Sequence, residues 1–170
     1  MTITLRPARP DDAVFLERWD RDPDVIASHG VEAQPDEIWR DEDWRAEIAI
    51  AQDWQRVLIG DEDGRPVGAV IDIDPAREET HYWGDCGPGL RAFDIWIGEA
   101  KDRGRGLGSA MMRAALDLAF SHPAVKAVII DPLTSNTRAI RFYERCGFYA
   151  VEKRWFATDH CLVMRCNRPD

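Results

Sequence analysis

Apolar residues along the chain recur with two spacings, one typical of strands and one typical of helices. Short runs of alternating or β-branched apolar residues predict strands at 3–6, 55–60, 66–73, 91–97, 125–130, 148–156 and 161–166. Longer segments with apolar residues every three or four positions predict helices at 10–19, 36–54, 107–120 and 135–146. This order predicts a mixed α/β fold in which helices cover the faces of a central sheet.

Turn-forming residues separate these segments. Asp63 and Gly64 lie between the second and third strands, and an Asp-Gly pair is typical of a β-hairpin, so these strands should be antiparallel. Residues 20–35 contain two prolines and a glycine, which predicts a loop or a broken helical segment. Residues 74–89 show no period, and their aromatic run at 81–83 suggests that this loop covers something.

A glycine-rich turn at 103–109 lies between a predicted strand and a predicted helix. Glycines at alternate positions leave the backbone open to a ligand, and N–H groups at a helix start favour anions. Arg103 and Arg105 are expected to add positive charge. The dinucleotide motif G-x-G-x-x-G would need a glycine where Ser109 stands, and no G-K-[ST] follows for a P-loop. The turn therefore predicts an anion cradle of another kind.

Composition predicts one ordinary globular domain spanning 1–170. The chain is 45% hydrophobic and 31% charged. No stretch approaches the roughly 18 apolar residues of a membrane span, and the first residues lack a signal peptide's apolar region, so we expect a cytoplasmic protein without membrane association. The net charge of −9 argues against a nucleic-acid partner, because such binding relies on clustered Lys and Arg, and it fits a cationic substrate better.

The cysteines and histidines show no metal-binding pattern. The four cysteines form no C-x-x-C pair and, without a secretion signal, are expected to be reduced thiols. The histidines lie far apart without metal-ligand spacing. We predict no metal site and assign the histidines no role. The residues concerned are Cys86, Cys146, Cys161, Cys166, His29, His81, His122 and His160.

A second motif, after the glycine turn, makes the pattern specific. It reads Asn136-x-Arg138-Ala139-Ile140-x-Phe142-Tyr143-Glu144-x-Cys146-Gly147-Phe148. Together with the turn, and in this order on these elements, it resembles the GNAT superfamily of acyl-CoA-dependent N-acyltransferases over roughly residues 5–164. The stretches 87–94, 104–108 and 131–140 resemble the aminoglycoside 6'-N-acetyltransferases of that superfamily.

The resemblance implies the GNAT fold, with a mixed, mostly antiparallel sheet of about seven strands flanked by about four helices. It implies that the parallel strands 91–97 and 125–130 splay apart and hold the pantetheine arm of acetyl-CoA, while the turn holds the pyrophosphate. Asn136 would contact that arm or cap its helix, and both readings stay open. The implied coenzyme-binding residues are Ile95, Trp96, Ile97, Arg103, Gly104, Arg105, Gly106, Leu107, Gly108, Ser109, Asn136 and Ala139.

Acetyl transfer needs a neutral amine and a proton for the leaving thiolate. Asp94, on the strand at the mouth of the splay, is the candidate general base, acting directly or through a water. A free Asp has a pKa near 4 and is a weak base, so the alternative is that Asp94 only orients the ammonium. Tyr143 matches the family tyrosine that gives a proton to the coenzyme A sulfur. Its alternative role is to pack its helix and orient the thioester by a hydrogen bond.

The acceptor is predicted to be a cationic small molecule, most simply an aminoglycoside-like polyamine. Eight acids stand against three bases between residues 71 and 102, and carboxylates bind polyamine sugars. The predicted acceptor contacts are Asp94, Asp131, Glu79, Trp83, Asp85 and Asp159. The loop acids could instead be solvated surface charges, and Trp83 could pack rather than stack on a sugar.

Two other functions stay open. The acceptor could be a protein N-terminus, a lysine-type amine or a siderophore precursor. A non-catalytic acyl-CoA sensor domain is the alternative from another class, and the presence of both Asp94 and Tyr143 speaks against it, because a sensor needs only the cradle. For assembly we expect a monomer or a homodimer.

Overall fold

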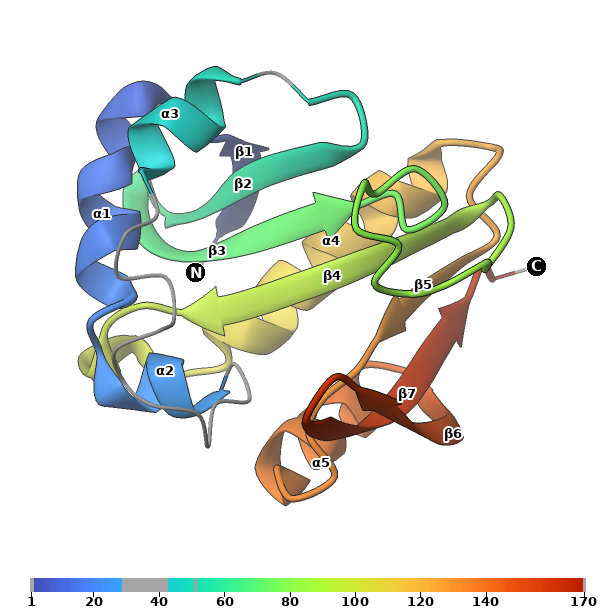
Figure 1. The fold of residues 1–170 in the computed structure, drawn as a ribbon. Coiled ribbons are helices and arrows are strands. Elements are labelled where there is room, and N and C mark those ends of the chain that lie inside the picture. Colours follow the sequence, from blue (N-terminus) through green and yellow to red (C-terminus); the bar gives the residue numbers. More distant parts are fainter. Residues whose placement is uncertain (1, 29–42, 51, 170) are drawn as a thin grey trace.

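A seven-stranded sheet organises the computed structural model, which describes residues 2–28, 43–50 and 52–169 (Figure 1). The strands lie in the order β1-β2-β3-β4-β5-β7-β6. They are β1 (Ile3–Pro7), β2 (Gln55–Glu62), β3 (Arg65–Ile73), β4 (Leu90–Ile97), β5 (Ala127–Ile130), β6 (Tyr149–Phe156) and β7 (Asp159–Asn167). The helices are α1 (Ala13–Trp19), α2 (Pro23–Ser28), α3 (Trp44–Ala49), α4 (Leu107–Ser121) and α5 (Thr137–Arg145), with short 3₁₀ turns at Pro10–Asp12 and Ala100–Asp102. The predicted mixed α/β fold is confirmed.

All neighbouring strands are antiparallel except β4 and β5, and this parallel pair is short. Only residues 90–92 of β4 pair with residues 127–129 of β5. Beyond Ala92 and Ile129 the two strands diverge, as Figure 1 shows toward the C-terminal end of β4. The remaining residues of β4 stay paired with β3 on their other side. The predicted splay of the two parallel strands is therefore present.

The hairpin between β2 and β3 forms as the Asp-Gly pair predicts. The strands are antiparallel, and Asp63 and Gly64 both have positive φ, 51° and 86°. Positive φ at both central residues is the turn conformation whose twist matches that of the flanking strands. The hairpin places Glu62 and Arg65 on either side of the turn, where both meet the segment after β4.

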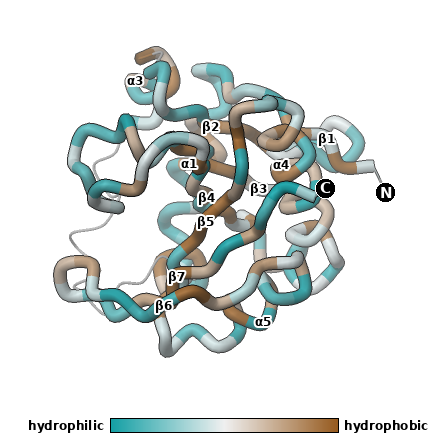
Figure 2. The backbone as a smooth tube through the Cα atoms, turned by 90° about the vertical axis from the view of Figure 1, so that its right-hand side faces the viewer, coloured by the Kyte–Doolittle hydropathy of each residue, from teal (hydrophilic) through white to brown (hydrophobic). Residues whose placement is uncertain are grey.

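The two larger of three apolar clusters lie on opposite faces of the sheet, and the third, which includes Trp83 and Phe156, lies beside β5 and β7. The period-2 alternation of a strand sends Leu58 into one core and Ile59 into the other. On one face α4 packs Met111 and Met112 against the sheet, and on the other α1 and α3 bury tryptophans, Trp19 among them. Figure 2 shows the apolar colouring concentrated in the central strands. The sheet is thus a rigid support with both faces covered.

The N-terminal helices differ from the predicted segments. Within the described chain, the helix expected at 36–54 is reduced to α3. The Asp43 carboxylate caps its start, and Ile50 leaves the helical conformation at its end. Residues 36–42 lie outside the described residues. The segment 20–35 contains α2, whose first turn is capped by the Asp22 carboxylate and begins at Pro23. Five α-helices therefore stand in the described ranges where about four were expected. None of them is long and apolar enough to cross a bilayer.

Gly98, directly after β4, is required by close packing and not by an unusual backbone conformation. A Cβ at this position would lie 2.1 Å from Cε2 of Trp19, a side chain that is 1% exposed. The indole N–H of Trp19 also donates to Glu99 at 3.3 Å, which fixes the ring over the glycine. Helix α1 therefore packs directly on the backbone that leads into the glycine turn.

We expect Gly98→Ala to lower the free energy of unfolding by about 1–3 kcal/mol, the usual effect of overpacking a dense core. Chemical denaturation followed by fluorescence measures this. In a Trp19→Leu background the same alanine should cost less, because the overlapping ring is gone. Equal costs in both backgrounds would contradict the packing argument.

Candidate active site

The splay between β4 and β5 opens into a cavity of about 810 Å³. Its walls come from residues 93–97 of β4, the glycine turn, the segment 130–136 after β5, and one face of α5. Tyr82 from the 74–89 loop and residues of α2 and β7 complete the lining. The cavity therefore joins most of the predicted coenzyme residues and three of the six predicted acceptor residues in one space.

The glycine turn forms the anion cradle at one end of this cavity. Gly104 and Gly106 have φ of 75° and 85°, and nothing lies within 4 Å of a Cβ built on either, so their backbones are open. Gly106 is the N-cap of α4, whose first N–H groups have no partner within the helix. Gly104, Gly106, Gly108 and Ser109 all line the cavity. These groups fit a pyrophosphate at a helix N-terminus.

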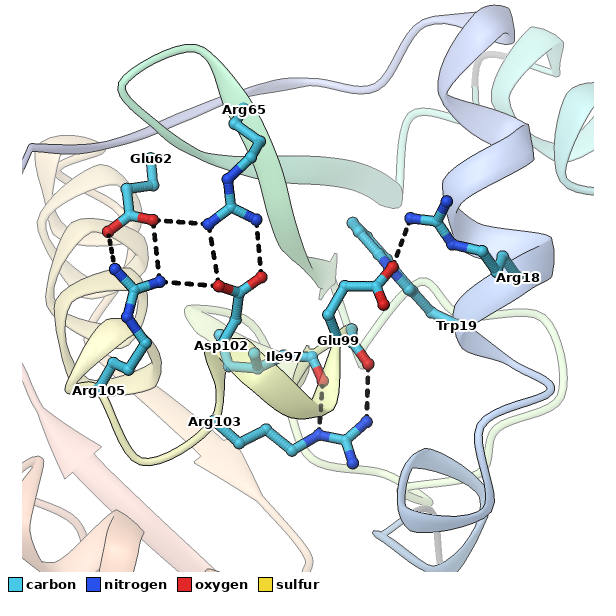
Figure 3. Close-up of polar contacts among 10 residues, drawn as sticks. Arg18, Trp19, Glu62, Arg65, Ile97, Glu99, Asp102, Arg103 and Arg105 are labelled. Carbon is cyan, nitrogen blue, oxygen red and sulfur yellow. Dashed lines mark hydrogen bonds and ion pairs between the residues drawn. The ribbon is translucent and has the colours of Figure 1, made fainter.

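The two arginines of the turn do not supply the expected free positive charge (Figure 3). Arg103 donates to the carbonyl of Gly98 at 2.7 Å and pairs with Asp22 and Asp24 at 2.8 and 2.6 Å. Arg105 pairs with Glu62 at 2.8 Å and with Asp102 at 2.7 Å. Their charges are offset by carboxylates, so they hold the turn in place. Within the turn, anion binding is then left to the backbone.

Asp102 is the buried centre of the network around Arg105. Its side chain is 2% exposed and lies between the guanidinium groups of Arg65 and Arg105, both at 2.7 Å (Figure 3). Hydrogen bonds from Arg65 in particular hold the pKa of Asp102 below its ordinary value. Because Arg65 belongs to the β2–β3 hairpin, the network ties the sheet to the start of the turn.

Leu107 lies in the turn but is fully buried in the core beneath it. Its side chain faces away from the cavity, and its backbone N–H is the only polar group that it can offer a ligand. Leu107 thus anchors the first turn of α4.

Helix α5 forms the opposite wall. The side chain of Asn136 accepts the Ala139 N–H at 3.0 Å, which is an N-cap, and both residues also line the cavity. The capping role of Asn136 is therefore present in the structure, and its amide group still borders the cavity. Tyr143 lies two turns further on the same wall.

Tyr143 combines packing with a place at the site. Its ring packs against Phe148, with ring centroids 5.9 Å apart, and the residue borders the main core. Burial, with the charges of Asp94 and Asp131 in addition, raises the pKa of its hydroxyl above the ordinary value. The hydroxyl is therefore protonated at neutral pH, as a proton or hydrogen-bond donor must be.

Three carboxylates line the acceptor end of the cavity, namely Asp94 on β4, Asp131 after β5 and Asp159 at the start of β7. Burial first, and then the charges of Asp94 and Asp159, raise the pKa of Asp131 to about 7. A hydrogen bond from the hydroxyl of Tyr82, at 2.6 Å, acts in the opposite direction. A cluster of this charge favours a cationic ligand.

The other predicted acceptor residues lie outside the cavity wall. Trp83 is 7% exposed and packs edge-on against Phe156, with ring centroids 5.2 Å apart. Glu79 is exposed on the loop, and Asp85 borders a separate surface depression with Cys86. Of the predicted alternatives, packing for Trp83 and a solvated charge for Glu79 agree with these positions.

Sequence reasoning missed several residues of the wall, among them Tyr82, Arg138 and Arg145. Tyr82 stands in the aromatic run and Arg138 in the second motif, whereas Arg145 is one of that motif's unspecified positions. Arg138 and Arg145 are seven positions apart on α5 and so share a face with Phe142, a spacing that could have identified them. Within the described residues no group of three His, Cys, Asp or Glu could hold a metal ion, and the four cysteines are free thiols.

A splayed parallel pair, a glycine turn at a helix start and a capped helix on the far wall define an acyl-CoA-dependent N-acyltransferase site. The acetyltransferase (GNAT) domain family matches residues 9–156. The chain belongs to this family, which confirms the superfamily resemblance, the GNAT fold and the class of acetyl-CoA-dependent N-acetyltransferase.

Named relatives point to one branch of the family. Aminoglycoside N(6')-acetyltransferase type 1 of Klebsiella pneumoniae is 32% identical over 149 residues, which cover 86% of this chain and 74% of the relative. The kanamycin resistance protein of Rhizobium radiobacter is 40% identical over 72 residues, 42% of this chain and 67% of that protein. A solved aminoglycoside 6'-acetyltransferase of type Ib, in complex with ribostamycin and coenzyme A, superposes with a TM-score of 0.85 at 26% identity, covering 99% of this chain and 94% of that one.

We expect Gly106→Ala to weaken coenzyme A binding several-fold, because a Cβ strains the left-handed backbone at the N-cap of α4 by roughly 1–2 kcal/mol. Isothermal titration calorimetry measures the affinity. Gly87→Ala is the matched control, since Gly87 also has positive φ and open space but lies in the 74–89 loop, outside the cavity wall. The assignment is wrong if both variants bind coenzyme A equally well.

Acceptor binding should depend on pH through Asp131. Because the pKa of this carboxyl is raised to about 7, it is largely protonated at pH 5.5 and increasingly ionised by pH 7.5. We therefore expect the Kd of a polycationic aminoglycoside to fall over this interval, and Asp131→Asn to flatten the dependence. Titration calorimetry at four pH values tests this, and an unchanged slope in Asp131→Asn would contradict it.

Proposed function

We propose that the protein transfers the acetyl group of acetyl-CoA to a primary amine of an aminoglycoside-like polyamine, of the 6'-N type, by direct attack in a ternary complex. The observation that carries this proposal is that Asp94, Asp131 and Asp159 line the same cavity as the glycine turn. A donor cradle and an anionic acceptor end thereby meet in the gap between β4 and β5. The names of the relatives support the same acceptor.

The reaction can be assigned to residues of the wall. The amine must lose a proton before it attacks, and Asp94 takes that proton directly or through a water. The nitrogen then bonds to the thioester carbon, and a backbone N–H of residues 95–97, on the edge of β4 that β5 leaves, stabilises the oxyanion. As the carbon–sulfur bond breaks, the Tyr143 hydroxyl donates toward the departing sulfur.

The raised pKa of Tyr143 refines its role as the acid. Thiols ordinarily have a pKa near 8.5 and tyrosine near 10, so full proton transfer from a tyrosine with a further raised pKa is uphill. The hydroxyl therefore acts chiefly by a hydrogen bond that stabilises the thiolate as it forms. The attacking nitrogen loses its second proton as the amide forms, and this proton neutralises the thiolate, so that coenzyme A leaves as the thiol.

The presence of both Asp94 and Tyr143 on the wall favours catalysis over a binding-only sensor domain. A protein N-terminus, a lysine-type amine or a siderophore precursor would each be acetylated by the same machinery, and the acceptor assay below separates them. The cytoplasmic location and a monomeric or homodimeric state remain predictions from the sequence.

Thiol release from acetyl-CoA should be measured with kanamycin, ribostamycin, linear polyamines, a lysine peptide and a free peptide N-terminus. We expect turnover with the aminoglycosides at the highest kcat/KM, and mass spectrometry should find one acetyl group on the 6'-amine. If the peptides were acetylated and none of the aminoglycosides were, the proposed acceptor would be wrong and the enzyme class would still stand.

Tyr143→Phe should lower kcat about 10²–10³-fold with little change in the affinity for acetyl-CoA, because the hydroxyl stabilises the departing thiolate and does not contribute to binding. Steady-state kinetics and titration of coenzyme A measure the two effects. Tyr149→Phe is the matched control, since that hydroxyl accepts from Asn167 at 3.1 Å on the outer strands β6 and β7. Equal rates for the two variants would remove Tyr143 from the mechanism.

A further inference from the structure

The loop between β3 and β4 reaches the acceptor end of the cavity through one hydroxyl. Tyr82 donates a hydrogen bond to Oδ2 of Asp131, at 2.6 Å, from a position 49 residues earlier in the chain. Both residues line the cavity. One oxygen of the Asp131 carboxylate is thereby occupied before any acceptor arrives, which leaves Oδ1 for a ligand.

Contacts of both the ring and the backbone of Tyr82 hold it in this position. The ring stacks on Phe156, with centroids 4.5 Å apart and planes 9° from parallel, and meets the edge of Trp83 at 5.4 Å. A guanidinium N–H of Arg154 donates to the carbonyl of Trp83 at 3.1 Å. The side chain is therefore supported by β6 and not by its own loop alone.

The backbone of the loop is fixed by a buried acid. The carboxylate of Glu78 accepts the N–H groups of Thr80 and Tyr82 at 2.6 and 2.9 Å. Burial alone would raise the pKa of Glu78, but these hydrogen bonds keep it below the ordinary value. Glu78 is therefore ionised at neutral pH and keeps Tyr82 in place through the loop backbone.

This arrangement gives the hydroxyl a use beyond packing, because stacking on Phe156 needs only the ring. A carboxylate free to rotate among Asp94, Asp159 and solvent would present its oxygens in many directions. A strong hydrogen bond to one oxygen restricts that rotation and stabilises the charged form. An oriented, ionised carboxylate binds an ammonium group better than a mobile one.

We propose that Tyr82 is a positioning residue for the acceptor, whose hydroxyl fixes one oxygen of Asp131 so that the other is directed at an ammonium group of a polycationic acceptor. The proposal rests on the proposed function for its substrate class. It assigns acceptor selectivity in part to the 74–89 loop, through a contact between Tyr82 and Asp131 that involves neither the donor nor the reacting atoms.

Tyr82→Phe tests this because it keeps the stacked ring and removes only the hydroxyl. We expect the KM of a polycationic aminoglycoside to rise about tenfold, the range for loss of a hydrogen bond to a charged group, while kcat and the KM of acetyl-CoA stay within twofold. Tyr149→Phe again serves as the control. In an Asp131→Asn background, Tyr82→Phe should have little further effect.

A pH profile separates this role from a merely structural one. The groups that face Asp131 are Asp94 on β4, Asp159 and Cys161 on β7, Tyr143 on α5 and Tyr82 itself. The Tyr82 hydrogen bond lowers the pKa of Asp131, so its loss should raise that pKa. The acidic limb of kcat/KM for the acceptor should then move to higher pH.

Carbon NMR titration of the Asp131 carboxyl gives the same answer without any acceptor. A higher pKa of Asp131 in Tyr82→Phe supports the positioning role even if every aminoglycoside fails as a substrate, in which case only the proposed function falls. An unchanged pKa of Asp131 together with an unchanged acceptor KM would overturn the role of Tyr82. So would an equal rise in KM in the Asp131→Asn background.

Discussion

The site exists because the hydrogen bonds between β4 and β5 stop after three residue pairs. Parallel pairing stops at Ala92 and Ile129, and the sheet then continues with a gap between its two central strands. Buried N–H and C=O groups must find partners, so a gap of this kind persists only where a ligand or water satisfies both edges. An extended chain of amides such as pantetheine satisfies them as an extra strand would. The cavity is therefore part of the sheet's own architecture.

The glycine turn needs a second constraint, because glycines alone make a mobile loop. The structure supplies it on both sides of the turn. Arg103 forms an ion pair with α2 and donates a hydrogen bond to the Gly98 carbonyl after β4, and Arg105 and Asp102 join the hairpin by ion pairs. Arginine suits this work because its planar group can meet two carboxylates at once. The ion pairs therefore hold the backbone N–H groups in position, and these N–H groups bind the charged ligand. Acetyl-CoA binding should accordingly depend less on these arginine charges than their place in the motif implies.

The elements, the antiparallel hairpin and the glycine cradle could be predicted from sequence because each has a local signature. The Asp63-Gly64 pair and the apolar period of α4 are examples. The partners of long side chains could not be predicted, since Arg103 and Arg105 look like ligand contacts until their carboxylate partners, most of them far away in the sequence, are known. Trp83 and Tyr82 are neighbours with opposite fates, one 7% exposed in the core and one at the cavity. Both rings contact Phe156, on a strand more than seventy residues later, and only Tyr82 also reaches Asp131 at the cavity.

Burying several carboxylates together at the acceptor end is unfavourable, and a cationic ligand can offset that cost. Burial first, and then repulsion from Asp94 and Asp159, raise the pKa of Asp131 to about 7, so its carboxyl is half protonated near neutral pH. A ligand with one ammonium group would relieve part of this repulsion, whereas a polycation can meet several of the carboxylates together. Because each added pairing also drives ionisation of Asp131, the gain per ammonium group grows with the charge of the acceptor. Selection of polyamines over single amines would then follow from the burial and mutual repulsion of these carboxylates, without a dedicated contact for every sugar.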